Sequence, residues 1–327
     1  MKLNDHFKTL LTDTVNLNQD RLDQLDERVT SIYDELADDD VLGPYVQDKI
    51  PQGSWAQRTI IKPVGTLEFD ADFLLLLAEN PEWSEHPKTY IEQVNAALAR
   101  SSVYKDMPRK RKCRCVRVTY ANSCHIDIVP FLHLADGRKV IVNHDEDDWE
   151  PTNPEGFTSW MRDKDEIADN NLRKVIRLLK YLRDHKGTFT GTRSVILTTL
   201  TGDRVDSFNT ILDSGYYGSV PTALLHIVQD LDEWLQANPA RPPVMDPSGS
   251  GASFDHRWDD DTYQIFRDQI QGYAADIAAA YHEPDKDASV ELWQAIFGDG
   301  FRAPAPKQSS GRFGPVAPVP ARPGRAG

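Results

Sequence analysis

The sequence predicts an α+β fold in which a lobe built on a mixed sheet precedes a lobe of helices. Short β-branched and aromatic runs with period-two alternation fill residues 60–134, as is typical of strands. After residue 154 the apolar residues recur at helical spacing almost throughout. With 39% hydrophobic residues among 327, the chain has enough apolar surface for a core in each lobe. Because ligands usually bind in clefts between lobes, we expect the functional site there.

The first lobe, predicted over residues 1–160, begins with an amphipathic helix. Its apolar residues between Leu22 and Leu36 recur at steps of three and four, and the pattern ends near residues 38–40. Alternation then predicts strands over 69–77 and within 116–132. A helical stripe within residues 87–100 separates them, and we expect that helix to pack on one face of the sheet.

The second lobe, predicted over residues 161–301, is expected to be helical. Apolar stripes predict amphipathic helices over 172–182, 224–235, 270–281 and 290–297. A stretch rich in Pro, Gly and Ser over residues 242–251 predicts a loop between them.

Residues 302–327 have a different composition from the rest of the chain. They contain six prolines, four glycines, five basic residues and no acidic residue. Such a segment cannot bury enough apolar surface to fold, so we predict a disordered basic tail.

Composition also excludes several classes of function. The formal net charge of −14 has the wrong sign for broad binding to DNA or to anionic lipid. No apolar run approaches the ~20 residues of a membrane span, and residues 1–11 lack the apolar segment of a signal peptide. Cysteines are too few for a disulfide framework. We therefore expect a soluble cytoplasmic protein without a membrane partner.

The first motif that carries chemistry is a Gly53-Ser54 turn ahead of apolar residues. Glycine there lets backbone N–H groups approach a phosphate, and the serine hydroxyl adds a donor. The pair is also common in ordinary loops, so both interpretations stay open for this motif taken alone.

The second motif is Asp70-Ala71-Asp72, which runs directly into apolar residues. Alternate side chains of a strand share a face, so both aspartates point the same way, about 6.5 Å apart at their Cα atoms. Carboxylates so close to an apolar strand repel each other and lose hydration, and a divalent cation resolves that conflict.

A third acid, Asp127, lies on a later predicted strand with Ile126 and Ile128 facing the other side. Three aspartates at one sheet face suit Mg²⁺, which prefers oxygen ligands, and Mn²⁺ as a substitute. Two such ions ~3.5 to 4 Å apart hold the attacking and the leaving oxygen of a displacement. The competing interpretation is a solvent-facing Asp-x-Asp pair and an unrelated strand aspartate.

The order of a Gly-Ser loop, an Asp-x-Asp strand and a later strand acid resembles the DNA polymerase β-like nucleotidyltransferase superfamily. With Thr59, Pro63, the strand over 125–130 and the ending over 292–298, it looks like the bacterial cGAS/DncV-like nucleotidyltransferases, or CD-NTases. The similarity covers about residues 10–301. It implies a polymerase β-like lobe, a C-terminal helical lobe and an active site in the cleft between them.

Carried over residue by residue, the resemblance implies roles for particular side chains. Gly53 and Ser54 would hold the donor triphosphate, and Asp70, Asp72 and Asp127 would be catalytic and bind two Mg²⁺ ions. Lys180 and Ser194 would contact phosphates from the helical lobe. Arg173, Arg177 and Lys180 share one helix face, which either points at the cleft or forms a solvated basic stripe.

The resemblance also implies a function, namely synthesis of a cyclic di- or trinucleotide from NTPs with release of pyrophosphate in bacterial antiphage defence. The product would activate a separate effector. A ubiquitin-like transferase or a regulatory protein is a candidate partner of the tail, which ends Arg325-Ala326-Gly327. A linear nucleotidyltransferase acting on RNA or protein remains an alternative, because one metal site serves all acceptors. A catalytically silent nucleotide-binding scaffold is a second alternative.

Other features have structural interpretations that we prefer. Cys113, Cys115 and Cys124 are expected to pack in the core, although three zinc ligands are an alternative. His125 is expected to be an ordinary strand residue. The basic run over 109–112 and the acidic run over 145–148 are expected to be loops.

Overall fold

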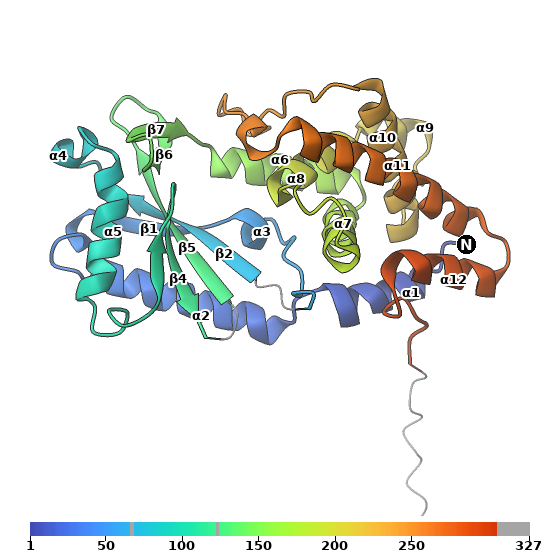
Figure 1. Cartoon of the computed structure of the whole chain (residues 1–327), viewed down its shortest axis with the longest axis horizontal. Coiled ribbons are helices and arrows are strands. Elements are labelled where there is room, and N and C mark those ends of the chain that lie inside the picture. The colour runs from blue at the N-terminus through green and yellow to red at the C-terminus, as the bar shows by residue number, and fades with distance from the viewer. Residues whose placement is uncertain (66–68, 122–123, 306–327) are drawn as a thin grey trace, which may run out of the picture.

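The computed structural model describes residues 1–65, 69–121 and 124–305, and Figure 1 shows its two lobes side by side. Most of the predicted tail, residues 306–327, lies outside the described part of the chain. No described helix is long and apolar enough to span a membrane. The α+β fold with a mixed sheet and a helical C-terminal lobe is confirmed.

The sheet lobe is built on one seven-stranded mixed sheet. Its strands are β1 (Val46–Gln52), β2 (Phe69–Leu77), β3 (Arg109–Arg111), β4 (Val116–Tyr120), β5 (Cys124–His133), β6 (Lys139–Asn143) and β7 (Asp148–Pro151). The order is β1-β2-β5-β4-β3, and β6 pairs with both β5 and β7. Among the strands within the described residues, only the β2–β5 pair is parallel, whereas the other pairs are antiparallel. The sheet therefore extends beyond the predicted stretch 60–134 at both ends.

Helices cover one face of this sheet, as Figure 1 shows for α2 and α5. The helices of this part of the chain are α1 (Asn4–Thr9), α2 (Gln19–Ala37), α3 (Gly53–Ala56), α4 (Pro81–Ser84) and α5 (Lys88–Arg100). Alternate β2 residues, among them Ala71 and Phe73, pack against α2 and α5 in one core. The aspartates between them must therefore face the other side of the sheet.

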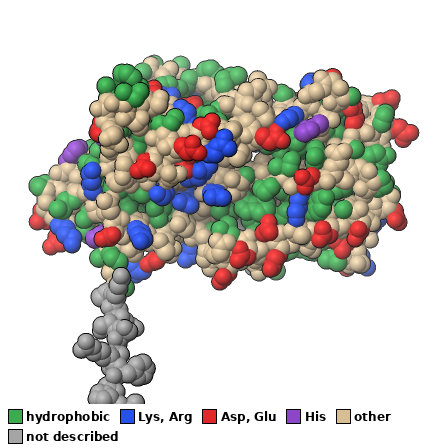
Figure 2. All heavy atoms as spheres, turned by 180° about the vertical axis from the view of Figure 1, so that it is seen from behind, with side chains coloured by type: hydrophobic (Ala, Val, Ile, Leu, Met, Phe, Trp, Pro, Cys, Tyr) green, Lys and Arg blue, Asp and Glu red, His purple; other side chains and the backbone are tan. Residues whose placement is uncertain are grey.

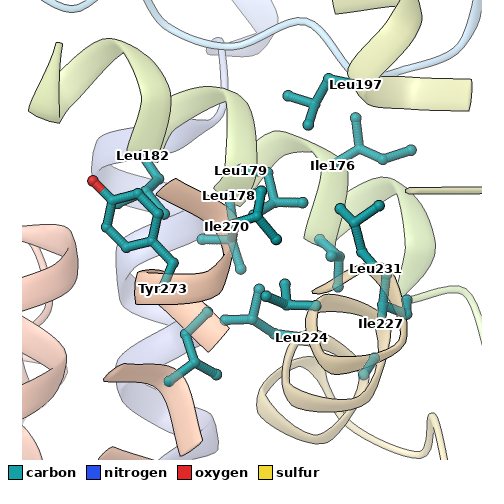
Figure 3. Close-up of a cluster of buried hydrophobic side chains, with 14 of the residues drawn as sticks. Ile176, Leu178, Leu179, Leu182, Leu197, Leu224, Ile227, Leu231, Ile270 and Tyr273 are labelled. Carbon is teal, nitrogen blue, oxygen red and sulfur yellow. The ribbon is translucent and has the colours of Figure 1, made fainter. Parts of the chain in front are cut away.

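The helical lobe has its own apolar core, drawn in Figure 3 with Ile176, Leu224 and Ile270 among its members. Its helices are α6 (Pro154–Ile167), α7 (Leu172–Lys186), α8 (Ser194–Asp203), α9 (Ser207–Leu212), α10 (Val220–Ala237), α11 (Asp260–His282) and α12 (Lys286–Phe297). The π-helical turn η1 (Leu10–Val15), which follows α1, also packs into this core through Leu10 and Val15. The start of the chain thus joins the second lobe, whereas the predicted division at residue 160 stays a prediction.

The surface carries both signs of charge in spite of the net charge of −14. Figure 2 shows Lys and Arg side chains gathered near the middle of one face, with Asp and Glu side chains beside them. A protein of acidic composition thus still offers local basic surface.

Candidate active site

A cleft of about 1290 Å³ is lined by residues of both lobes. All seven residues predicted to form the site contribute to its wall, although they come from five different elements. These residues are Gly53, Ser54, Asp70, Asp72, Asp127, Lys180 and Ser194. The structure therefore brings together side chains that are up to 141 positions apart in sequence, from Gly53 to Ser194.

The acidic wall of the cleft is the sheet face opposite α2 and α5. Asp70 and Asp72 both lie on this face of β2, as the alternation of strand side chains requires. Asp72 is the register partner of Asp127 on the parallel strand β5. Neighbouring strands lie only about 4.8 Å apart, so these two carboxylates are held close together by the backbone.

Arg117 of β4 partly neutralises this acidic wall. It is the antiparallel register partner of Asp127 and donates to both of its oxygens, at 2.6 Å from Nε and 2.7 Å from Nη2. The same Nη2 lies 3.0 Å from Asp70 Oδ2. The hydrogen bonds to Asp127 and the negative charges of Asp127 and Asp70 hold the pKa of Arg117 above its usual value, although burial acts in the opposite direction.

Asp72 receives less of that compensation, because the charges of Arg117 and Lys112 offset its burial only in part. Among the described residues, its carboxylate has no hydrogen-bond or ion-pair partner at contact distance. Burial raises the pKa of Asp72 to about 7, and repulsion by Asp127 and Asp70 adds to this effect. A cation that enters the cleft would therefore relieve an electrostatic cost that the protein carries in its absence.

The Gly53-Ser54 turn lies directly against Asp72. Gly53 begins the one-turn helix α3 with φ +63°, a conformation that side chains with a Cβ rarely adopt. A Cβ at this position would lie 2.5 Å from Asp72 Oδ2. Glycine is thus required here for two independent reasons, and the turn borders the acidic wall.

Lys180 and Ser194 form part of the opposite, helical wall. Lys180 is almost fully buried, and its Nζ donates to Thr59 O at 3.0 Å and to Thr59 Oγ1 at 3.2 Å. Burial lowers the pKa of Lys180 to about 7, with repulsion from Arg183 as the second cause. Ser194 is the first residue of α8, and its hydroxyl accepts from Arg183 at 3.3 Å.

The donor set suits a hard cation, although the described side chains do not enclose one. No group of three His, Cys, Asp or Glu residues within the described ranges is arranged to hold a metal ion. Asp70, Asp72 and Asp127 supply carboxylate oxygens, the ligands that Mg²⁺ prefers, and the charges of Arg117 and Lys112 compensate Asp72 only in part. The residues present therefore fit the predicted metal in chemistry, while Arg117 interacts with two of them.

Residues 1–165 match the family model described as the Second Messenger Oligonucleotide or Dinucleotide Synthetase domain, SMODS. The chain belongs to the SMODS family. This match confirms the resemblance to CD-NTases that the motifs indicated.

Relatives of the SMODS chain include a c-di-GMP synthase of Roseivirga ehrenbergii, which is 30% identical over 182 aligned positions, and the match covers 50% of this chain and 46% of that protein. This chain thus spans about half the length of the curated relatives it matches.

Solved structures share its fold. CdnG of Bradyrhizobium diazoefficiens in complex with GTP superposes with a TM-score of 0.71 at 18% identity, covering 91% of this chain and 96% of that one. The cyclic AMP-GMP synthase DncV of Vibrio cholerae, in complex with a linear intermediate, gives 0.71 at 15% identity, with the same coverage. The predicted nucleotidyltransferase fold is confirmed by these neighbours.

Sequence reasoning missed several basic residues in or beside the SMODS cleft. Arg117, which contacts two of the aspartates, lies between two apolar strand residues, and this is the one sequence signal that sets it on the same face as Asp127. Arg183, Arg193 and Arg257 line the cleft. Arg257 ends the 3₁₀ helix η3 (Asp255–Arg257) between α10 and α11, and no local pattern connects it to the aspartates.

The cysteines and the basic run differ in part from expectation. Cys115 and Cys124 are buried, as expected, and burial raises the pKa of both thiols. Cys113 is only half-buried, borders the cleft and donates to Asn143 Oδ1 at 3.1 Å. The basic run was wrongly expected to be a loop, because Arg109–Arg111 forms the edge strand β3. Charged residues are common on such exposed edges, where they discourage pairing with other chains.

Proposed function

We propose that this SMODS protein makes a cyclic di- or trinucleotide from NTPs in a metal-dependent reaction that releases pyrophosphate. The observation that carries the proposal is a single cleft in which Asp70, Asp72 and Asp127 face the cationic residues of the helical lobe. A metal-bound triphosphate brings positive charge to the acidic wall and negative charge to the basic wall. The relatives named as cyclic nucleotide synthases support the choice of product.

In the proposed reaction a ribose hydroxyl of one nucleotide attacks the α-phosphorus of another NTP, and pyrophosphate leaves. The Gly53-Ser54 turn holds the donor triphosphate through backbone and hydroxyl donors. Lys180 and Ser194 neutralise and orient the same phosphates from the opposite wall. Repetition of the reaction within the cleft joins the two ends of the linear product and closes the ring.

Asp70, Asp72 and Asp127 are the residues that would hold Mg²⁺. Bound there, the metal would lower the pKa of the attacking hydroxyl and neutralise charge on the phosphates. Asp127 is the candidate for helping to take the hydroxyl proton. We further propose that the product acts as a second messenger in bacterial antiphage defence and activates a separate effector protein.

The experiment that tests this function is an assay of purified protein with labelled NTPs and Mg²⁺, followed by phosphatase. A cyclic product keeps its label because it has no terminal phosphate, and mass spectrometry then gives its bases and ring size. Chelation by EDTA should abolish synthesis, and Mn²⁺ should restore it. Transfer of label to added RNA or protein would contradict the proposal in favour of a linear nucleotidyltransferase, and absence of turnover with every candidate activator would favour a scaffold.

A further inference from the structure

Three basic residues of α7 bind three consecutive backbone carbonyls of the segment that follows the Gly53-Ser54 turn. Arg173 Nε donates to Gln57 O at 3.0 Å, and Arg177 Nη1 donates to Arg58 O at 3.3 Å. Lys180 completes the series with its 3.0 Å hydrogen bond to Thr59 O. The sequence left open whether this face of α7 forms a wall of the cleft or a solvated basic stripe. Over most of its length the face does neither, because its cations bind the backbone of residues 57–59.

The segment that these cations hold is bonded directly to the turn. Gln57 N donates to Gly53 O at 3.1 Å, and Thr59 N donates to Ser54 O at 2.9 Å. Gln57 and Thr59 are both buried. Any shift of their carbonyls would therefore move Gly53 and Ser54, which border Asp72 and the cleft.

Arg173 and Arg177 do not line the cleft, whereas Gln57, Thr59 and Lys180 do. The two arginines are nevertheless kept in place at a cost. Burial lowers the pKa of Arg177, and its Nε is buried without a hydrogen-bond partner. Arg173 is fixed by the buried carboxylate of Asp165, which lies 2.5 Å from its Nη1. Partly buried cations of this kind cost free energy of desolvation, which their hydrogen bonds and ion pairs must offset.

We propose that Arg173 and Arg177 are positioning residues that fix the Gly53-Ser54 turn for the donor triphosphate. This inference rests on the proposed function and adds to it a connection between α7 of the helical lobe and the phosphate-binding turn of the sheet lobe. Each arginine acts through a backbone carbonyl of residues 57–59 and not through contact with the nucleotide. The helical lobe thereby determines the geometry of a turn that sequence analysis assigns to the other lobe.

The test is Arg177→Met, compared with the matched control Lys174→Met. Lys174 lies on α7 as well, but its Nζ contacts Asn171 and it does not line the cleft. We expect the KM for NTP to rise about tenfold in Arg177→Met, the order expected for one lost hydrogen bond from a charged donor. The kcat should change less than about threefold, because binding of substrate and transition state is weakened alike. Arg177→Lys should restore most of the affinity, and Lys174→Met should leave KM unchanged.

Hydrogen exchange supplies a readout that needs no catalysis. The amides of Gln57 and Thr59 should exchange faster in Arg177→Met than in the wild type, while those of the Lys174→Met control should not. Arg177→Gln, which keeps N–H donors without the charge, serves as a second variant if Arg177→Met does not fold, and its KM should also rise. An unchanged KM with unchanged amide exchange, or a loss confined to kcat and thermal stability, would overturn the inference. A wild-type protein that makes no nucleotide product would instead overturn the proposed function, and the exchange result would still stand on its own.

Discussion

The two walls of the cleft carry opposite charge and acquire it in different ways. On the sheet wall, strand alternation and a single register pairing bring Asp70, Asp72 and Asp127 together, and one arginine balances two of them. On the helical wall, Lys180 has two hydrogen bonds to Thr59, and Ser194 is supported by Arg183. The comparison teaches that the acids have few substitutes in the metal site that we propose, whereas the contacts of the helical wall overlap.

The largest effect is expected on the sheet wall. Asp127→Asn should lower the rate of product formation by about a thousandfold or more, because it removes a charge that both the metal and the attacking hydroxyl need. The rate is measured with labelled NTPs at saturating Mg²⁺. Asp163→Asn, at an exposed position of α6, is the matched control and should retain the wild-type rate. A near-normal rate in Asp127→Asn would remove the distinction between the walls.

An intermediate effect is expected from the charge of Lys180, and it should depend on pH. The pKa of Lys180 is lowered to about 7 in the free protein, and a bound triphosphate favours the charged form and raises that pKa again. Binding therefore takes up a proton once the pH exceeds about 7, so the KM for NTP should increase between pH 7 and 8.5, by up to about tenfold per unit. Lys180→Met should have a high KM that no longer varies in this way. Equal pH dependence in the two proteins would show that another group is responsible.

The smallest effect is expected at Ser194. Arg183 also donates to Thr192 O at 3.0 Å and pairs with Asp184 at 2.7 Å, so it keeps its position when the serine hydroxyl is removed. Ser194→Ala should therefore raise the KM for NTP only about threefold, the worth of one neutral hydrogen bond. Steady-state kinetics at several NTP concentrations check this value. A loss as large as that of Asp127→Asn would mean that the contacts of the helical wall do not overlap.

Local sequence patterns were sufficient for much of the fold and for choosing Asp70, Asp72 and Asp127 as candidates, whereas Lys180 and Ser194 were chosen from the family resemblance. The apolar stripes that predicted α2, α5 and α7 fall within the observed helices, because a helix that buries one face repeats its apolar residues with a period of 3.6. The strands β1, β3, β6 and β7 were missed. β1 reads Val-Gln-Asp-Lys-Ile-Pro-Gln, a sequence whose polar residues are tolerated because the strand lies at the edge of the sheet.

What the sequence by itself determined is therefore the orientation of side chains within each element. Alternation put Asp70 and Asp72 on one face, and helical spacing put Arg173, Arg177 and Lys180 on another. Only the tertiary structure decided what each face meets. The pairing of Arg117 with Asp127 depends on strand register, and the contacts of α7 with residues 57–59 depend on how the lobes dock. The contacts of α7 join segments more than a hundred residues apart in sequence, and no local periodicity encodes how the two lobes pack against each other.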